Sequence, residues 1–234
     1  MGLDWQYEER REFVVGVDLG QAHDPTAIAV IEHVRVRVRP EYVQAYGTDS
    51  RRRALLGEWD RAIRSNHPPQ YNVRHLERLP LGTHYPAQVA HIAEMVRRAP
   101  LKDAPVFYDY TGVGRAVGDL LHQAGIRKLR RVHLTGGHES RSDGDRHAVS
   151  KVDLVSRLQA ALHAGELAIE HTLPDAAVLA RELADYRLNF TAAGNAQFNA
   201  RSGAHDDLLI ATGLALYGCQ VSQTPTAIPI GFAL

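Results

Sequence analysis

Apolar and polar positions in the first third of the chain alternate with the period of β-strands. An apolar run at 13–18 (FVVGVD) is followed by a turn-rich segment and by a β-branched run at 26–34, which together predict a hairpin. The alternation continues through 35–39, with arginine at every second position and valine between. A further strand is expected at 71–79. This part of the chain therefore predicts antiparallel strands.

Helical and strand patterns alternate after about residue 80. Helices are expected at 51–65, 86–98, 114–125, 150–164, 173–186 and 204–218, and strands at 104–109, 130–135, 187–191 and 196–199. The polar, glycine-containing segment 136–149 indicates a loop or a weak hairpin. Antiparallel strands followed by alternating helices and strands predict an α/β fold, a mixed sheet of five or more strands with helices on both faces.

Nothing divides the chain into two comparable halves, so a single domain over 1–234 is expected. Its core would cover about 13–218, with an extended tail at 220–234. The 234 residues are 44% hydrophobic and 23% charged, which is ordinary globular composition. The charged N-terminus has no apolar signal core, and the apolar stretch 208–219 is shorter than the roughly 20 residues that span a bilayer. With the single cysteine Cys219, this favours a cytoplasmic protein without a membrane partner.

The charge balance neither favours nor excludes a nucleic-acid partner. Twenty-seven basic residues balance 27 acidic ones, whereas a dedicated nucleic-acid binder often has a basic excess. A nuclease must also hold a cluster of carboxylates, so its basic residues would have to gather on one face. Arginines outnumber acids within 35–64, and this segment could contact a DNA backbone.

Four aspartates occupy positions that suit a metal centre. Asp18 and Asp109 each end an apolar strand, and Asp206 and Asp207 open the last predicted helix. Such residues are also typical of turns and of first helical turns. Together, however, they can converge on one point, and convergent carboxylates repel one another unless a cation joins them. Oxygen ligands suit Mg²⁺ or Mn²⁺.

Five segments in order resemble the nuclease domain of phage large terminase subunits. They are VVGVDLGQAHDPTAIAVIE, HLERLPLGTHYP, VFYDYTGVGRAVGDLL, VSKVDLVSRLQAAL and FNARSGAHDDLLIATGLALY. The resemblance covers about residues 13–218 and implies a ribonuclease H-like fold. It implies that Asp18, Asp109 and Asp206 bind metal, that Asp207 is the second acid of an HDD motif, and that Lys151 lies near the catalytic cluster.

The activity implied by the resemblance is two-metal hydrolysis of double-stranded DNA by an endonuclease with two Mg²⁺ or Mn²⁺ ions. A packaging motor also needs an ATPase, but the chain has no G-x-x-x-x-G-K-[ST] motif. An ATPase motor, a portal and a small terminase subunit are therefore expected as partners, with this chain either an excised domain or a separate gene product. Residues 35–70 look like an insertion relative to the family pattern.

Three other interpretations remain open. A resolvase or transposase-like nuclease would use the same fold and the same acids. An actin or sugar-kinase type of ATPase would use GVDLG as a phosphate-facing hairpin, although DYTGVGRAV is a poor second phosphate loop. A non-catalytic relative would only bind nucleic acid or a capsid protein, but it would gain nothing from carboxylates facing phosphate.

The two adjacent acids of the HDD motif need separate treatment. Neighbouring helix positions differ by about 100° in direction. If the last helix begins near Ala204, only one of Asp206 and Asp207 can point squarely into the site. The resemblance assigns that position to Asp206 and leaves Asp207 as an outer carboxylate.

Overall fold

The structure is a computed structural model that describes residues 7–22, 24–38, 63, 65–136, 140–190, 196–199 and 205–222. For 38, 187–190 and 196–199 it describes the backbone alone. Most of the insertion expected at 35–70, nearly all of the helix expected at 51–65 and the tail from 223 onward lie outside these residues. Within them, no helix is both long and apolar enough to cross a membrane.

Eight strands form one mixed sheet in the order β6-β7-β5-β4-β1-β2-β3-β8. Their bounds are β1 Tyr7–Asp18, β2 Ala27–Val38, β3 Gln70–Arg78, β4 Val106–Asp109, β5 Leu129–Thr135, β6 Arg141–Asp143, β7 Arg146–Ser150 and β8 Leu167–Ile169. The strands β9 Arg187–Phe190 and β10 Ala196–Asn199 pair separately. The N-terminal strands are antiparallel, whereas β4 pairs parallel with both β1 and β5. The predicted mixed sheet is therefore confirmed.

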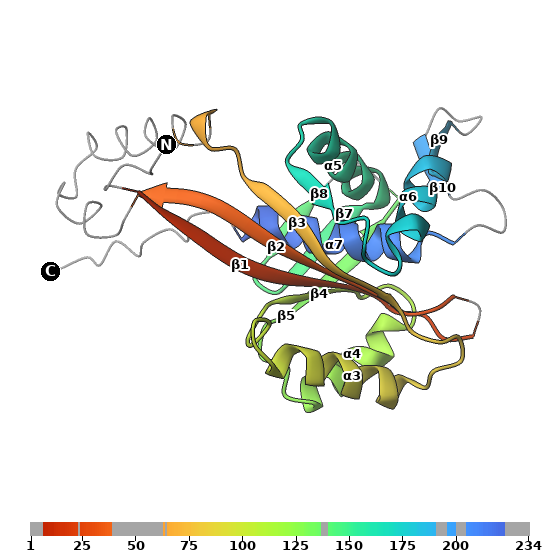
Figure 1. The fold of residues 1–234 in the computed structure, drawn as a ribbon. Helices are drawn as coiled ribbons and strands as arrows, with labels where there is room; N and C mark the ends of the chain where they lie inside the picture. Colours follow the sequence, from red (N-terminus) through yellow and green to blue (C-terminus); the bar gives the residue numbers. More distant parts are fainter. Residues whose placement is uncertain are drawn as a thin grey trace, which may run out of the picture.

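The first hairpin is longer than its apolar run. Register pairs Tyr7 with Val38 and Asp18 with Ala27, so charged positions before residue 13 also belong to β1. Cross-strand ion pairs compensate these charges, with Arg37 Nε 2.6 Å from Glu8 Oε1 and Arg35 Nη2 3.3 Å from Glu12 Oε2. The long ribbon extends beyond the helical layers (Figure 1).

Short strands form both edges of the sheet; a hairpin was one of the two structures expected at one edge, and the strand at the other edge was unexpected. The polar segment 136–149 contains the β6–β7 hairpin, and β7 continues the sheet in parallel with β5. The strand β8 was not predicted, because its three residues carry too short a pattern, and it pairs with β3.

Helices cover both faces of the sheet (Figure 1). On one face lie α3 Tyr85–Arg97 and α4 Gly114–Gln123, and on the other lie α5 Lys151–His163, α6 Ala176–Asp185 and α7 Asp207–Val221. Each layer has its own apolar core. In β1, Val14 belongs to the core on the α7 face, whereas Val15 and Val17 belong to the core on the α3 and α4 face.

The helix α7 lies directly against β1. A Cβ built on Gly16 would be 2.0 Å from the carbonyl oxygen of Ala211, so only glycine permits this approach. The helix is buried on nearly all sides, as its uniformly apolar sequence predicts. One turn before Ala211 is Asp207, and two residues after Gly16 is Asp18. The close packing therefore brings the start of α7 to the end of β1.

Candidate metal centre

Two of the predicted acids end adjacent parallel strands. Asp18 is the last residue of β1 and Asp109 the last of β4, each directly after the paired residues Val17 and Tyr108. Val17 and Tyr108 both belong to the core on the α3 and α4 face. Because side chains alternate along a strand, Asp18 and Asp109 face the α7 side of the sheet.

A cavity of about 410 Å³ opens at this end of the sheet. It brings together four of the five predicted site residues, Asp18, Lys151, Asp206 and Asp207. The other residues that line it are Leu19, Gly20, Gln21, Ala22, Asp24, Pro25, Tyr85, Val113 and His205. The lining thus comes from the β1–β2 loop and the starts of α3, α4, α5 and α7.

Asp109 lies beside this cavity rather than in its lining. Its Oδ1 accepts hydrogen bonds from the Thr111 hydroxyl and, at 2.7 Å, from the Thr111 backbone N–H. Burial raises its pKa, while these hydrogen bonds and the charge of Lys151 act in the opposite direction. Its charge in turn raises the pKa of Asp18, so the two carboxylates interact.

Asp206 and Asp207 both line the cavity. The helix α7 begins at Asp207, and Asp206 is its N-cap residue, with φ −125° and ψ 19°. The expectation that the helix begins near Ala204 is therefore wrong, and the 100° rule for helical neighbours does not apply to this pair. Lys151 Nζ lies 3.6 Å from Asp206 Oδ2, so the predicted lysine lies beside Asp206 at the cavity.

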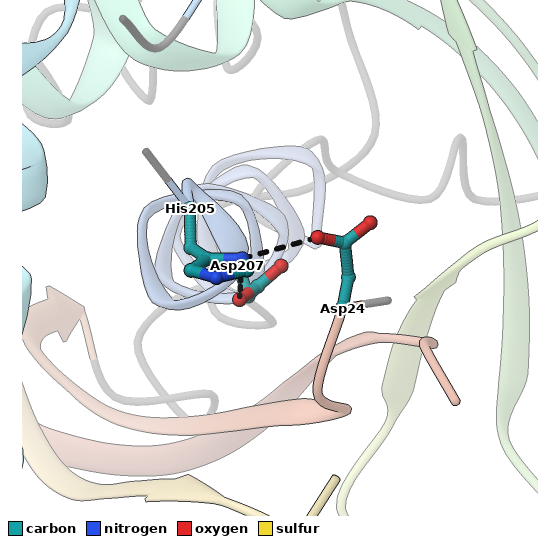
Figure 2. A group of neighbouring side chains, drawn as sticks. All are labelled: Asp24, His205 and Asp207. Carbon is teal, nitrogen blue, oxygen red and sulfur yellow. Dashed lines mark hydrogen bonds and ion pairs between the residues drawn. The ribbon is translucent and has the colours of Figure 1, made fainter. Parts of the chain in front are cut away.

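Two residues that the sequence reasoning missed complete the group around Asp207. His205 Nδ1 lies 3.1 Å from Asp24 Oδ1 and 3.8 Å from Asp207 Oδ2 (Figure 2). The ligand atoms of these three side chains lie within 4.8 Å of one another. His205 is the first residue of the HDD motif, and Asp24 lies in the polar turn after Asp18, but neither position alone indicates that they meet.

The loop that carries Asp24 is held by a buried amide from α3. Gln88 Nε2 donates to the carbonyl oxygens of Gly20 at 2.8 Å and Thr83 at 2.7 Å, and Gln88 Oε1 accepts from the Thr26 hydroxyl at 2.8 Å. A Cβ on Gly20 would lie 2.1 Å from the Asp24 carbonyl oxygen. The loop is thus tightly closed on itself.

The electrostatics of the cluster suit a bound cation. Burial, followed by the charges of Asp109 and Asp207, raises the pKa of Asp18 well above its usual value, against the opposing charge of Lys151. Burial also raises the pKa of Asp207 to about 6. The Oδ2 atom of Asp207 is buried without a hydrogen-bond partner in the described structure. An unsatisfied carboxylate oxygen among other carboxylates fits a divalent cation with oxygen ligands.

Comparisons with known proteins identify the architecture. No protein-family model matches the chain, and no curated protein matches it. Among solved structures, the magnesium-bound large terminase nuclease of thermophilic phage G20c has a TM-score of 0.57 and 20% identity, over 88% of this chain and 81% of that one.

The chain has the fold of large terminase nuclease domains. The nuclease domain of Thermus phage P74-26 gives a TM-score of 0.54 at 20% identity, over 88% of this chain and 78% of that one. The large terminase nuclease domain of bacterial virus Sf6 gives 0.52 at 14% identity, over 88% and 87%. At these identities the likeness concerns the fold, and it confirms the expected ribonuclease H-like α/β class.

Proposed function

We propose that this protein is a metal-dependent endonuclease that cuts double-stranded DNA. The observation that carries the proposal is the convergence of Asp18, Asp206 and Asp207 on one cavity, with Asp109 beside it and Lys151 among them. The fold shared with large terminase nucleases supports the same assignment. A cluster of carboxylates at the end of a sheet can bind a divalent cation, and the cation can in turn bind a phosphate of DNA.

The four aspartates would hold two Mg²⁺ or Mn²⁺ ions. Such ions, when bound, lower the pKa of a water and stabilise the charge on the leaving 3′ oxygen. Asp18 lines the cavity with Asp206 and Asp207 and ends the strand beside that of Asp109, and the charges of these three acids and of Lys151 all act on its pKa. We propose that it contacts both ions.

Lys151 serves the phosphate rather than the metal. Its ammonium group lies 3.6 Å from Asp206 Oδ2 and is partly exposed at the cavity. From this position it can offset charge on a bound phosphate or orient the attacking water by a hydrogen bond. The pairing with Asp206 fixes the lysine before DNA arrives.

Asp206 and Asp207 would both be metal ligands, on different sides of the cavity. Asp206 faces Lys151, whereas Asp207 faces Asp24 and His205. The test compares Asp206→Asn with Asp207→Asn over a range of Mn²⁺ concentrations, and we expect both to abolish cleavage. If Asp207→Asn costs only about 10–100-fold, the loss typical of outer residues, Asp207 is the outer carboxylate that the sequence suggested.

The biological setting follows by analogy with the terminases. We propose a single nuclease domain that acts in the host cytoplasm with an ATPase motor, a portal and a small terminase subunit. Contacts with phosphates alone give little base preference, so cleavage should be largely independent of sequence.

The experiment is a plasmid-nicking assay with Mg²⁺, Mn²⁺ or EDTA, with Asp18→Asn as the inactive control. We expect cleavage that requires the metal and falls steeply with salt. Full activity in EDTA, or cleavage at one short sequence alone, would contradict the proposal. Preference for a four-way junction over linear duplex would instead favour a resolvase-like nuclease.

A further inference from the structure

An arginine outside the cavity lining contacts one of the proposed metal-centre acids, Asp207, from the end of β3. Arg78 is the last residue of β3 and pairs across the sheet with Ala27, which pairs with Asp18. Asp18 and Arg78 therefore stand in one cross-strand row and face the same side of the sheet. The Nη2 atom of Arg78 contacts Glu182 Oε1 and lies 3.3 Å from Asp207 Oδ2.

The partner glutamate is itself fixed at both oxygens. Glu182 is buried on α6, and its Oε2 accepts the backbone N–H of Leu209 in the first turn of α7 at 2.8 Å. The backbone N–H of Arg78 donates to Asp175 Oδ2 at 3.2 Å, at the N-terminus of α6. These contacts connect the end of β3 to two positions on or next to α6, and they connect α6 to the start of α7.

We propose that Arg78 and Glu182 form a positioning pair that directs the Asp207 carboxylate toward the cavity. This rests on the proposed metal-dependent function. Asp207 Oδ2 has no hydrogen bond in the described structure, so contacts with the Arg78 guanidinium at 3.3 Å and the His205 ring at 3.8 Å constrain the carboxylate instead. Without Arg78, nothing described on the β3 side would prevent its rotation away from Asp24 and His205.

The role of Glu182 in the pair differs from that of Arg78, because Glu182 compensates the charge of the guanidinium. Arg78 carries one positive charge and contacts Glu182 more closely than Asp207. Glu182 therefore compensates the guanidinium, and the charge of Asp207 is left for a cation. If Glu182 lost its charge, Arg78 would pair with Asp207 alone and compete with the metal. An acid that does not line the cavity should thus strengthen metal binding.

The sheet offers a matched control. Arg74 lies four residues earlier on β3, and its Nη2 atom is 2.6 Å from Glu32, which is also buried. Both pairs join an arginine of β3 to a buried glutamate, with the Arg74 side chain 46% exposed and that of Arg78 23% exposed. Within the described residues, the ion pairs of Arg74 are with Glu32 and Glu170, and neither glutamate lines the cavity. Arg74→Met therefore removes a comparable ion pair without touching Asp207.

The experiment measures Mn²⁺ binding by calorimetry, together with the Mn²⁺ dependence of plasmid nicking, for the full chain and its variants. We expect Arg78→Met and Glu182→Gln each to raise the half-saturating Mn²⁺ concentration about 10–100-fold. At saturating Mn²⁺, kcat should recover to within about threefold and the KM for DNA should stay unchanged. Arg78→Lys should give an intermediate shift, and Arg74→Met none.

The double variant Arg78→Met/Glu182→Gln tests the pairing itself. If the two residues act as a pair, the double variant should lose less Mn²⁺-binding free energy than the sum of the losses in the two single variants. Unchanged Mn²⁺ binding in folded Arg78→Met overturns the proposal, as does a change in the KM for DNA alone, which would make Arg78 a DNA contact. If Arg78→Met fails to fold, Glu182→Gln and Arg78→Lys decide by the same measurement. Mn²⁺ binding that responds as expected in a protein that never cuts DNA would contradict the proposed function and leave the positioning pair intact.

Discussion

Removal of the Asp207 charge should stabilise the metal-free protein while abolishing its activity. Burial raises the pKa of this carboxyl from 3.8 to about 6. The folded state therefore holds a proton on Asp207 more tightly than the unfolded state does. Asparagine has the same shape without the charge, and Arg78 keeps Glu182 as its closer partner in the variant.

The pKa shift sets the size and pH range of the effect. A raised carboxyl pKa gives stability that is fully present below the unfolded pKa and is lost as pH rises through the folded pKa. The rise of the Asp207 pKa from 3.8 to about 6 corresponds to about 3 kcal/mol, an upper limit reached above pH 7. In EDTA, the free energy of unfolding of Asp207→Asn should exceed that of wild type by up to about 3 kcal/mol at pH 8. At pH 5 the difference should be roughly half of that.

The assay is thermal unfolding of both proteins in EDTA from pH 5 to pH 8. For a chain of this size, about 3 kcal/mol corresponds to a rise in Tm of roughly 6–12 °C. Added Mn²⁺ should reverse the order, because the metal stabilises wild type by binding its folded state. A variant no more stable than wild type at pH 8, or equally stabilised at pH 5 and pH 8, would refute the electrostatic reasoning.

Three further perturbations test the parts that hold the site together. Gly16→Ala should destabilise the fold by about 3 kcal/mol in urea denaturation, because the new methyl meets the backbone of α7; a loss below about 1 kcal/mol would contradict that packing. Gln88→Leu removes the amide hydrogen bonds to the carbonyl oxygens of Gly20 and Thr83, so it should cost about 1–3 kcal/mol and weaken Mn²⁺ binding in calorimetry. Lys151→Ala should lower kcat about 100-fold with Mn²⁺ binding retained, whereas Lys151→Arg keeps the contact with Asp206 and should retain more activity.

The ends of β1 and β4 were predictable because each short apolar run finishes in an aspartate. A strand that is buried on both faces has a simple pattern, and parallel pairing of two such strands brings their final residues to one edge. Asp18 and Asp109 therefore followed from local sequence. The burial of α7 followed as well, since its residues are apolar on every side.

The group of Asp24, His205 and Asp207 did not follow from local sequence. Asp24 and His205 lie 181 positions apart, and their contact depends on the β1–β2 loop meeting the start of α7. The helix boundary also mattered, because three residues separate the expected start from the observed one. That difference changes whether adjacent acids can share a site.

The Arg78–Glu182 pair could not be predicted from the sequence for a different reason. Arg78 occupies a polar position in an alternating strand, which is typical of a solvent-facing side chain. Glu182 occupies a helix in which acids are usually exposed. The burial of Glu182 and the partial burial of Arg78 result from the packing of β3, α6 and α7, and no local sequence pattern predicts that packing.

A chain without net charge needs a local source of attraction for DNA. The cavity is acidic, since it contains Lys151 and His205 against four carboxylates, namely Asp18, Asp24, Asp206 and Asp207. Such a surface repels phosphate until cations are bound. Metal binding must therefore precede productive DNA binding, and DNA affinity at the site should rise with Mn²⁺ concentration even in a variant that cuts only slowly. Lys151→Ala provides that variant, because it keeps every proposed ligand. Filter binding or fluorescence anisotropy with a short duplex would measure the dependence, and DNA affinity independent of Mn²⁺ would mean that basic residues elsewhere hold the substrate.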